Sequence, residues 1–142
     1  MKYYIGIDLG TSAMKLLLVN EDREVIKTVS KEYHLSFPRP SWSEQSPEDW
    51  WTALKDGIGE LLTEEEAKRV EALGVAGQMH GLVILDREDN VIRPAILWND
   101  GRTHEETDFL NETVGKEYPD SAGRSGDRGL GGYPGFAGEH SL

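Results

Sequence analysis

Residues 3–15 decide the fold of this chain, and they read Tyr3-Tyr4-Ile5-Gly6-Ile7-Asp8-Leu9-Gly10-Thr11-Ser12-Ala13-Met14-Lys15. The apolar residues on either side of the central Gly-Thr-Ser predict two strands, over residues 3–9 and 14–20, joined by a tight turn. An acidic residue lies at the end of the first strand, just before that turn. The pattern favours a hairpin with a polar loop at one end of a sheet.

The order Asp8, Gly10, Thr11, Ser12 supplies the groups that a nucleotide-phosphate site uses. We expect Gly10 to bend the backbone with a positive φ and to let it approach a ligand. Successive N–H groups in such a turn can form an anion-binding concavity. The hydroxyls of Thr11 and Ser12 add donors, and Asp8 can hold Mg²⁺ directly or through water. The alternative is a plain hairpin in which Gly-Thr-Ser is only a turn.

The composition limits the class of protein. A chain of 142 residues amounts to one domain or to part of a larger protein, and it contains no cysteine. Disulfides, thiolate metal sites and cysteine nucleophiles are therefore excluded, and a cytoplasmic location is favoured. The net charge of −11, without a basic stripe, argues against a nucleic-acid partner. No apolar run approaches the ~20 residues of a membrane span, and the N-terminus lacks the apolar region of a signal peptide.

The first half of the chain predicts a meander followed by a helix. Residues 25–34 alternate as a third strand and complete three antiparallel strands. A helix is expected over residues 47–62, with Ser46 as cap, Pro47 in the first turn and Asp49 in the capping-box position. Its apolar stripe comprises Trp50, Leu54, Ile58 and Leu61, widened by Trp51 and Leu62. Gly57 and Gly59 weaken this helix and indicate close packing.

Shorter elements are expected after the helix. The run from Thr63 to Glu66 predicts a capped short turn. Residues 70–76 predict a buried strand, residues 82–86 another strand, residues 87–90 a turn and residues 95–98 a short strand. A last helix is expected over about residues 103–114, with Phe109 and Leu110 as its core contacts.

The composition changes near Glu117, which predicts a boundary between a domain over residues 1–117 and a tail over residues 118–142. The tail is rich in Gly and almost free of aliphatic residues. Because it cannot bury enough apolar surface to offset the entropy of ordering, we expect it to be disordered.

Two later motifs contain candidate ligand-binding side chains. Gly77 and Gly81 flank Gln78, Met79 and His80, directly after the expected buried strand. Gln78 and His80 can hydrogen-bond a polyol, and Met79 can supply an adaptable apolar wall. The flanking glycines favour a close approach of the backbone to a ligand. The alternative is a structural histidine at the end of a strand.

The second motif is Trp98-Asn99-Asp100-Gly101-Arg102, at the end of a short strand, where α/β sheets bind ligands. Asp100 and Arg102 either pair with each other or bind sugar hydroxyls, with Trp98 packing beside the sugar ring. Trp42, in the loop before the capped helix, is a further candidate for the mouth of a ligand site.

Residues 8–12, 42–47, 77–81 and 98–102 together resemble the N-terminal domain of the FGGY carbohydrate kinases. The opening motif is shared by the actin-like ATPases. The later Gly-Gln-Met-His-Gly and Trp-Asn-Asp-Gly-Arg motifs are more specific and most similar to the xylulokinase group. Glycerol kinases have an Arg-Glu pair in place of Met79-His80, whereas gluconokinases can share the Met-His pair and stay an alternative. The resemblance implies an α/β, ribonuclease-H-like (actin-like ATPase) fold, of which residues 1–117 form the N-terminal part.

The resemblance also implies ATP- and Mg²⁺-dependent phosphorylation of D-xylulose to xylulose 5-phosphate. Asp8, Gly10, Thr11 and Ser12 would then bind the ATP phosphates, with Asp8 on the metal. The sugar would be bound by Gln78, Met79, His80, Trp98, Asp100 and Arg102.

The catalytic Asp of the family lies in a second domain beyond this chain, so no catalytic residue is assigned here. We therefore expect the isolated chain to be a catalytically inactive, aggregation-prone fragment. A shifted reading frame would explain the tail. The intact family member would use a small-molecule sugar and ATP, without nucleic acid or membrane, and a homodimer is compatible with the resemblance.

Overall fold

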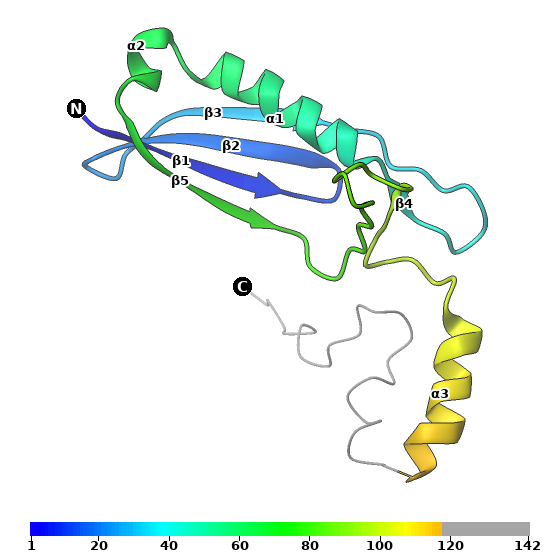
Figure 1. Cartoon of the computed structure of the whole chain (residues 1–142). Helices are drawn as coiled ribbons and strands as arrows, with labels where there is room; N and C mark the ends of the chain where they lie inside the picture. Colours follow the sequence, from blue (N-terminus) through cyan, green and yellow to red (C-terminus); the bar gives the residue numbers. More distant parts are fainter. Residues whose placement is uncertain (118–142) are drawn as a thin grey trace, which may run out of the picture.

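The computed structural model describes residues 1–117, with the side chains of residues 1–113. The expected disordered tail, residues 118–142, lies outside the described residues. The elements in chain order are β1 (Tyr3–Leu9), β2 (Ala13–Asn20), β3 (Val25–Glu32), β4 (Glu44–Gln45), α1 (Pro47–Leu61), α2 (Glu64–Ala67), β5 (Val70–Gly77), β6 (Ala95–Ile96) and α3 (His104–Glu117). Figure 1 shows α1 lying along one face of the main sheet and α3 projecting away from it.

The main sheet has four strands in the order β3-β2-β1-β5. β2 pairs antiparallel with β1 and with β3, which confirms the expected meander. β5 instead pairs parallel with β1, so that Asp8 lies beside Ala76 and Leu9 beside Gly77. The carboxyl ends of β1 and β5 therefore lie side by side at one end of the sheet. The two predicted loop motifs, residues 10–12 and 77–81, begin there. A small second sheet joins β4 to β6.

The core lies between α1 and the sheet. Leu16, Leu18 and Leu61 are completely buried, and Ile5 and Ile7 pack with them. Gly57 is needed here because a Cβ at this position would lie 2.5 Å from Leu16 Cδ1. That contact confirms the expected close packing. Gly59 faces open space, and Trp51 is 56% exposed, so both are wrong as packing predictions. Trp51 lies outside the stripe that faces the sheet.

The two helix starts differ in how their backbone N–H groups are satisfied. Ser46 is the cap residue of α1, but its side chain makes no capping hydrogen bond. Its carbonyl oxygen accepts from the N–H of Asp49 instead, so a backbone turn replaces the expected side-chain cap. In α2, Thr63 and Glu66 form the expected capping box in both directions.

β5 is a strand but not a buried one, which corrects the prediction for residues 70–76. Leu73 is 61% exposed and Val75 is 69% exposed. The reason is its position at the edge of the sheet, with β1 as its only strand partner in the described chain.

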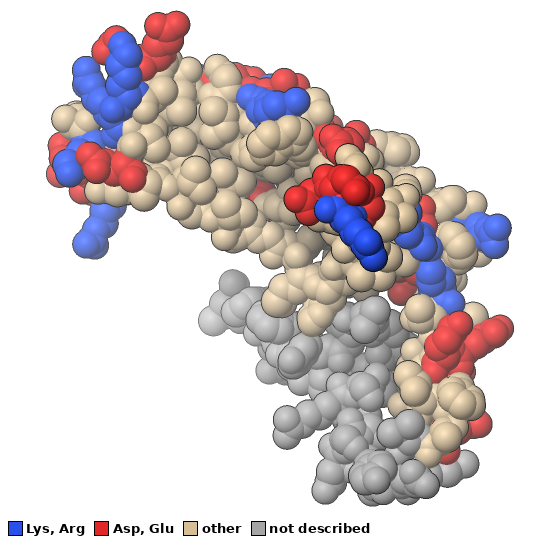
Figure 2. Space-filling view, in the orientation of Figure 1, with Lys and Arg blue, Asp and Glu red and all other residues tan. Residues whose placement is uncertain are grey.

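On the face of the molecule seen in Figure 2, most charged side chains lie toward the two ends and leave an uncharged area between them.

Residues 82–86 do not form the expected strand. They make only isolated bridges, Leu82 with Ile96 and Leu85 with Val91, around the predicted turn. The Asp86 carboxylate accepts from the N–H groups of Glu88 and Asn90, and these local bonds close the turn.

The final helix also differs from its prediction. Phe109 and Leu110 on α3 are 65% and 54% exposed, so they are not core contacts. α3 projects away from the sheet, so that within residues 1–117 its apolar residues Phe109 and Leu110 have no sheet surface to cover (Figure 1). None of the helices among the described residues has the length and hydropathy to cross a membrane.

Candidate phosphate and sugar site

The loop from Gly10 to Ser12 joins β1 to β2 and is held from both sides. Gly10 does not have the expected positive φ. It is required for space, because a Cβ at Gly10 would lie 2.8 Å from the carbonyl oxygen of Ala13. The N–H of Gly10 donates to that same oxygen at 3.1 Å, which closes the turn. A turn this tight has no room for a side chain on its inner side.

The three carbonyl oxygens of this loop are all engaged. The Tyr33 hydroxyl donates to Gly10 O, and the Tyr33 N–H donates to Ser12 O at 3.2 Å. Gln45 Nε2 donates to Thr11 O at 2.9 Å. Within residues 1–117, by contrast, the N–H groups of Thr11 and Ser12 donate no hydrogen bond. The loop therefore presents free donors and no free acceptors from its backbone.

Asp8 stands at the end of β1 with an exposed side chain. Its carboxylate forms no hydrogen bond or ion pair with the rest of the described chain. Its negative charge adds to the effect of burial on Tyr33, and together they raise the pKa of Tyr33 to about 12. At neutral pH, Tyr33 is thus a neutral donor to the loop.

Thr11 connects the loop to both later motifs. Its hydroxyl donates to Gln78 Oε1 at 3.1 Å and accepts from Trp98 Nε1 at 3.3 Å. The N–H of Gln78 also donates to Leu9 O at 2.9 Å, which ties the ends of β1 and β5 together. Gln78 Nε2 is buried and has no partner among the described residues. Three motifs that are far apart in the sequence therefore meet at one hydroxyl.

Met79 and His80 continue from Gln78 along the exposed edge. Met79 is 69% exposed. His80 has φ of 60°, in the left-handed region that a residue with a Cβ rarely adopts. Gly77 on one side of the motif would place a Cβ 3.2 Å from Leu9 Cβ, so it is required for strand packing.

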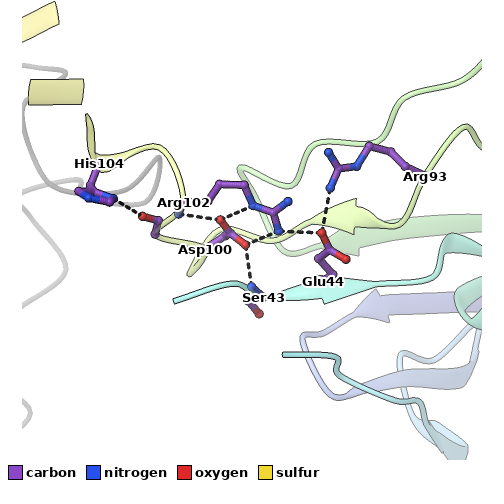
Figure 3. A network of polar contacts seen from close by, with 7 residues as sticks. Ser43, Glu44, Arg93, Asp100, Arg102 and His104 are labelled. Atoms are coloured by element: carbon purple, nitrogen blue, oxygen red, sulfur yellow. Dashed lines mark hydrogen bonds and ion pairs between the residues drawn. The ribbon is translucent and has the colours of Figure 1, made fainter. Parts of the chain in front are cut away.

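Asp100 and Arg102 pair with each other, which is the first of the two interpretations of their motif. Arg102 Nε donates to Asp100 Oδ1 at 2.8 Å and Nη2 donates to Oδ2 at 2.7 Å, a bidentate contact. The N–H of Ser43 donates to Asp100 Oδ2 at 2.6 Å, and Arg102 Nη2 also reaches Glu44 Oε1 at 2.8 Å. Figure 3 shows Arg102 between the two carboxylates.

The pair is part of a larger network that the sequence motifs did not indicate. Arg93 Nη2 donates to Glu44 Oε1 at 2.8 Å, so Glu44 lies between two arginines (Figure 3). The guanidinium of Arg102 also stacks on Trp42, with Cζ 3.7 Å from the ring centroid. Trp42 does line an open pocket of about 460 Å³, together with Phe37, Pro38, Arg39, Pro40, Ser41, Ser43 and Asn99. Glu44 lies in the motif over residues 42–47, but no role was assigned to it or to Arg93, because their partners are distant in the sequence.

The protonation states fit this network. Burial acts to raise the pKa of the Asp100 carboxyl, but the hydrogen bonds from Arg102 and from the Ser43 N–H outweigh it and hold that pKa below its ordinary value. The bond to Asp100 in turn raises the pKa of Arg102. Both groups are therefore charged, and each is matched by the other.

The described residues contain no group of three His, Cys, Asp or Glu side chains that could hold a metal ion by itself. Asp8 is thus a single carboxylate. This fits Mg²⁺, which usually takes one or two protein carboxylates and completes its shell with waters and substrate phosphates.

Known proteins resemble the chain in sequence and in structure. The family described as the FGGY family of carbohydrate kinases, N-terminal domain, matches residues 3–126. A xylulose kinase of Escherichia coli (strain K12) is 49% identical over 111 residues, which cover 78% of this chain and 23% of the relative. The chain therefore spans about a quarter of the length of the curated relatives it matches.

Solved structures agree. A kinase from Brucella ovis, named a xyloylose kinase, has a TM-score of 0.71 at 40% identity over 79% of this chain and 24% of its own. A xylulose kinase from Rhodospirillum rubrum has a TM-score of 0.75 at 32% identity over 82% of this chain and 25% of its own. These neighbours confirm the predicted α/β, actin-like ATPase fold. The chain belongs to the FGGY family of carbohydrate kinases and contains N-terminal domain sequence of that family.

Proposed function

We propose that this chain is the N-terminal part of an ATP-dependent sugar kinase that phosphorylates D-xylulose to xylulose 5-phosphate in the cytoplasm. The observation that supports this most strongly is the hydroxyl of Thr11, which joins the loop with free N–H groups to Gln78 and Trp98. A phosphoryl-transfer enzyme needs its phosphate-binding and acceptor-binding groups side by side in this way, because its catalysis consists mainly of positioning and charge stabilisation.

In this proposal the phosphate side consists of Asp8, Gly10, Thr11 and Ser12. The free N–H groups of Thr11 and Ser12 would bind phosphate oxygens. The unpaired carboxylate of Asp8 would hold Mg²⁺ directly or through water. Bound Mg·ATP supplies the phosphoryl group, and the metal ion neutralises its charge. The chain's own residues would bind and orient the phosphates.

The sugar side consists of Gln78, Met79, His80 and Trp98. Gln78 Nε2, buried without a partner, offers a donor for a hydroxyl. We assign Asp100 and Arg102 to this side in a supporting role, because their strong donors and acceptors are already paired. They would hold the segment that presents Trp98. The group that accepts the proton from the sugar lies outside this chain.

Two alternatives are weighed against this assignment. The specificity of a gluconokinase or of another FGGY sugar kinase would use the same Met79-His80 pair with a different sugar. A catalytically inactive truncated product would keep the fold without turnover, and we expect this for the isolated chain.

A chimera tests the proposal directly. Residues 1–117 would be joined to the remainder of the Escherichia coli xylulose kinase, whose matching segment is 49% identical. We expect ATP consumption that depends on D-xylulose in a coupled assay, and no turnover by the isolated chain. Preference for gluconate over D-xylulose would favour the first alternative. A folded chimera without any turnover would contradict the proposal.

Two variants of the chimera separate the two sides of the site. Asp8→Asn should lower turnover far more than sugar affinity, because its carboxylate acts on the metal. His80→Ala should raise KM for D-xylulose by about 2- to 10-fold, the effect of losing one hydrogen bond. Equal effects of both variants on turnover and KM would contradict the division into two sides.

A further inference from the structure

We propose that Gln45 is a positioning residue for the phosphate loop, fixing the peptide between Thr11 and Ser12 so that its N–H faces the ligand. The ligand in this inference rests on the proposed function, whereas the loop geometry does not. Gln45 ends β4, two residues before α1, and it lies within the motif over residues 42–47 without an assigned role.

The side chain of Gln45 is 1% exposed, and its carboxamide is fully used. Nε2 donates to Thr11 O at 2.9 Å and to His34 O at 3.2 Å. Oε1 accepts from Trp50 Nε1 at 2.7 Å. The two donors and the acceptor thus connect the loop, the segment after β3 and helix α1. A carboxamide held at three points has one orientation.

The planarity of the peptide bond turns this contact into control of the loop. The carbonyl of Thr11 and the N–H of Ser12 belong to one peptide unit, and in a trans peptide they point in opposite directions. Because Gln45 holds the carbonyl, the N–H must face away from Gln45. Tyr33 acts in the same way on the preceding unit, since it holds Gly10 O opposite the N–H of Thr11.

No other hydrogen bond to Thr11 O is formed within the described chain. Without Gln45, this peptide would be free to rotate. An N–H that spends part of its time turned inward is a weaker phosphate donor, because the ligand must then offset the cost of ordering it. An apolar side chain of equal size would fill the same volume and leave the peptide uncontrolled.

The test compares two buried carboxamides in the full chain of 142 residues. Gln45→Met removes the clamp with little change in volume. Asn20→Leu is the matched control, because Asn20 is 3% exposed and its side chain holds the turn between β2 and β3, at the other end of β2. The readouts are the amide nitrogen and proton shifts of Thr11 and Ser12 without ligand, the Mg·ATP dissociation constant, and the thermal melting curve.

We expect both variants to melt at a lower temperature than the parent chain. Only Gln45→Met should shift the Thr11 and Ser12 amides, and it should weaken Mg·ATP binding by about tenfold or more. Asn20→Leu should leave those amide shifts unchanged. Its Mg·ATP dissociation constant should stay within about twofold of the value for the parent chain. Trp50→Phe removes the donor to Gln45 Oε1 but keeps both Nε2 bonds. Its effect on the Thr11 and Ser12 amide shifts and on Mg·ATP binding should lie between the effects of Gln45→Met and Asn20→Leu.

Parent-like amide shifts in Gln45→Met would overturn the inference, and so would equal changes in Gln45→Met and Asn20→Leu. If Gln45→Met does not fold, Gln45→Glu repeats the test with the same shape but without the donors. Failure of both to fold, with Asn20→Leu folded, would make Gln45 a core residue and would also overturn the inference. If the parent chain binds no Mg·ATP, the chimera decides the proposed function, and the ligand-free amide shifts still decide the role of Gln45.

Discussion

The loop from Gly10 to Ser12 and the network around Asp100 and Arg102 are both polar, yet they are completed in opposite ways. In the network, the carboxylates accept from arginines and from a backbone N–H, so that its charges are matched internally. In the loop, the carbonyl oxygens are taken by Tyr33 and Gln45, whereas the N–H groups of Thr11 and Ser12 are left over. A cluster whose opposite charges pair with each other supports the fold, even though Ser43 Oγ and Arg93 Nε have no partner among the described residues, and a loop that leaves only backbone donors is suited to bind an anion.

The network also explains how the loop acquires its distant partners. The N–H of Leu97 donates to Ser43 O, and the N–H of Gly101 donates to Ser41 O, so the two segments run together. Arg102 and Asp100 lock this pairing with charge. Trp98, which lies between these anchors, can then reach Thr11.

The largest expected effect tests the network as a support. Asp100→Ala leaves the Ser43 N–H buried without an acceptor and removes the bidentate partner of Arg102. Breaking a buried ion pair from one side costs about 3–5 kcal/mol, which we expect as the loss in free energy of unfolding in urea. Glu105→Ala serves as control, since its contact with His104 is exposed, and should change stability by less than about 0.5 kcal/mol. A loss of less than about 1 kcal/mol in Asp100→Ala would contradict the supporting role.

The same carboxylate predicts the response to acid. The pKa of Asp100 is lowered in the folded chain, so its contribution is present above the unfolded value of about 3.9 and is lost as the pH falls below it. We therefore expect the stability difference between the parent and Asp100→Asn to shrink from about pH 5 down to about pH 2. A difference that is constant over this range would show that the charge of Asp100 does not contribute.

Gly10→Ala tests the loop, with a smaller expected effect. The added Cβ would lie 2.8 Å from Ala13 O, which is backbone and cannot move aside easily. We expect a cost of about 1–3 kcal/mol, the range for forcing extra volume into a packed site, and a change in the amide shifts of Thr11 and Ser12. Gly59→Ala is the matched control, because a Cβ there meets open space. Stabilisation of the chain by Gly10→Ala would contradict the tight turn.

Tyr33→Phe should have the smallest effect, about 0.5–1.5 kcal/mol for one neutral hydrogen bond. Its distinguishing feature is the pH dependence. The pKa of Tyr33 is raised to about 12, so the unfolded chain releases this proton first, and stability falls between about pH 10 and pH 12. That part of the alkaline loss should be missing in Tyr33→Phe. An identical alkaline profile for the variant and the parent would argue against a buried hydroxyl donor.

Local pattern predicted the parts of the fold that depend on near neighbours. The meander over β1 to β3 and helix α1 follow from alternation and from helical spacing, and the close approach at Gly57 was indicated by the glycine itself. Burial of β5 could not be predicted in this way. Leu73 and Val75 have the composition of a core strand, but their exposure depends on what packs against them.

The site shows the same limit. Both interpretations of Asp100 and Arg102 were visible in the sequence, and only the fold shows that Ser43 and Glu44 complete their pairing. The sequence indicated that Gly10 is needed, but the predicted reason, a positive φ, was wrong. The actual reason is the short distance to Ala13 O, and both reasons require the same residue, glycine. Gln45 lies in the motif over residues 42–47, but its role could not be assigned from the sequence, because its partners lie in three separate parts of the chain.

A titration of the nitrogen-15-labelled chain with Mg·ATP tests the central claim most directly, because it observes the loop and the network in one sample. We predict that the amides of Thr11 and Ser12 shift most, followed by the side-chain amide of Gln78 and the indole N–H of Trp98. The amides of Asp100, Gly101 and Arg102 should keep their chemical shifts, since their N–H groups already donate hydrogen bonds within the chain. Shifts centred on Asp100 and Arg102, with Thr11 and Ser12 unchanged, would contradict the account.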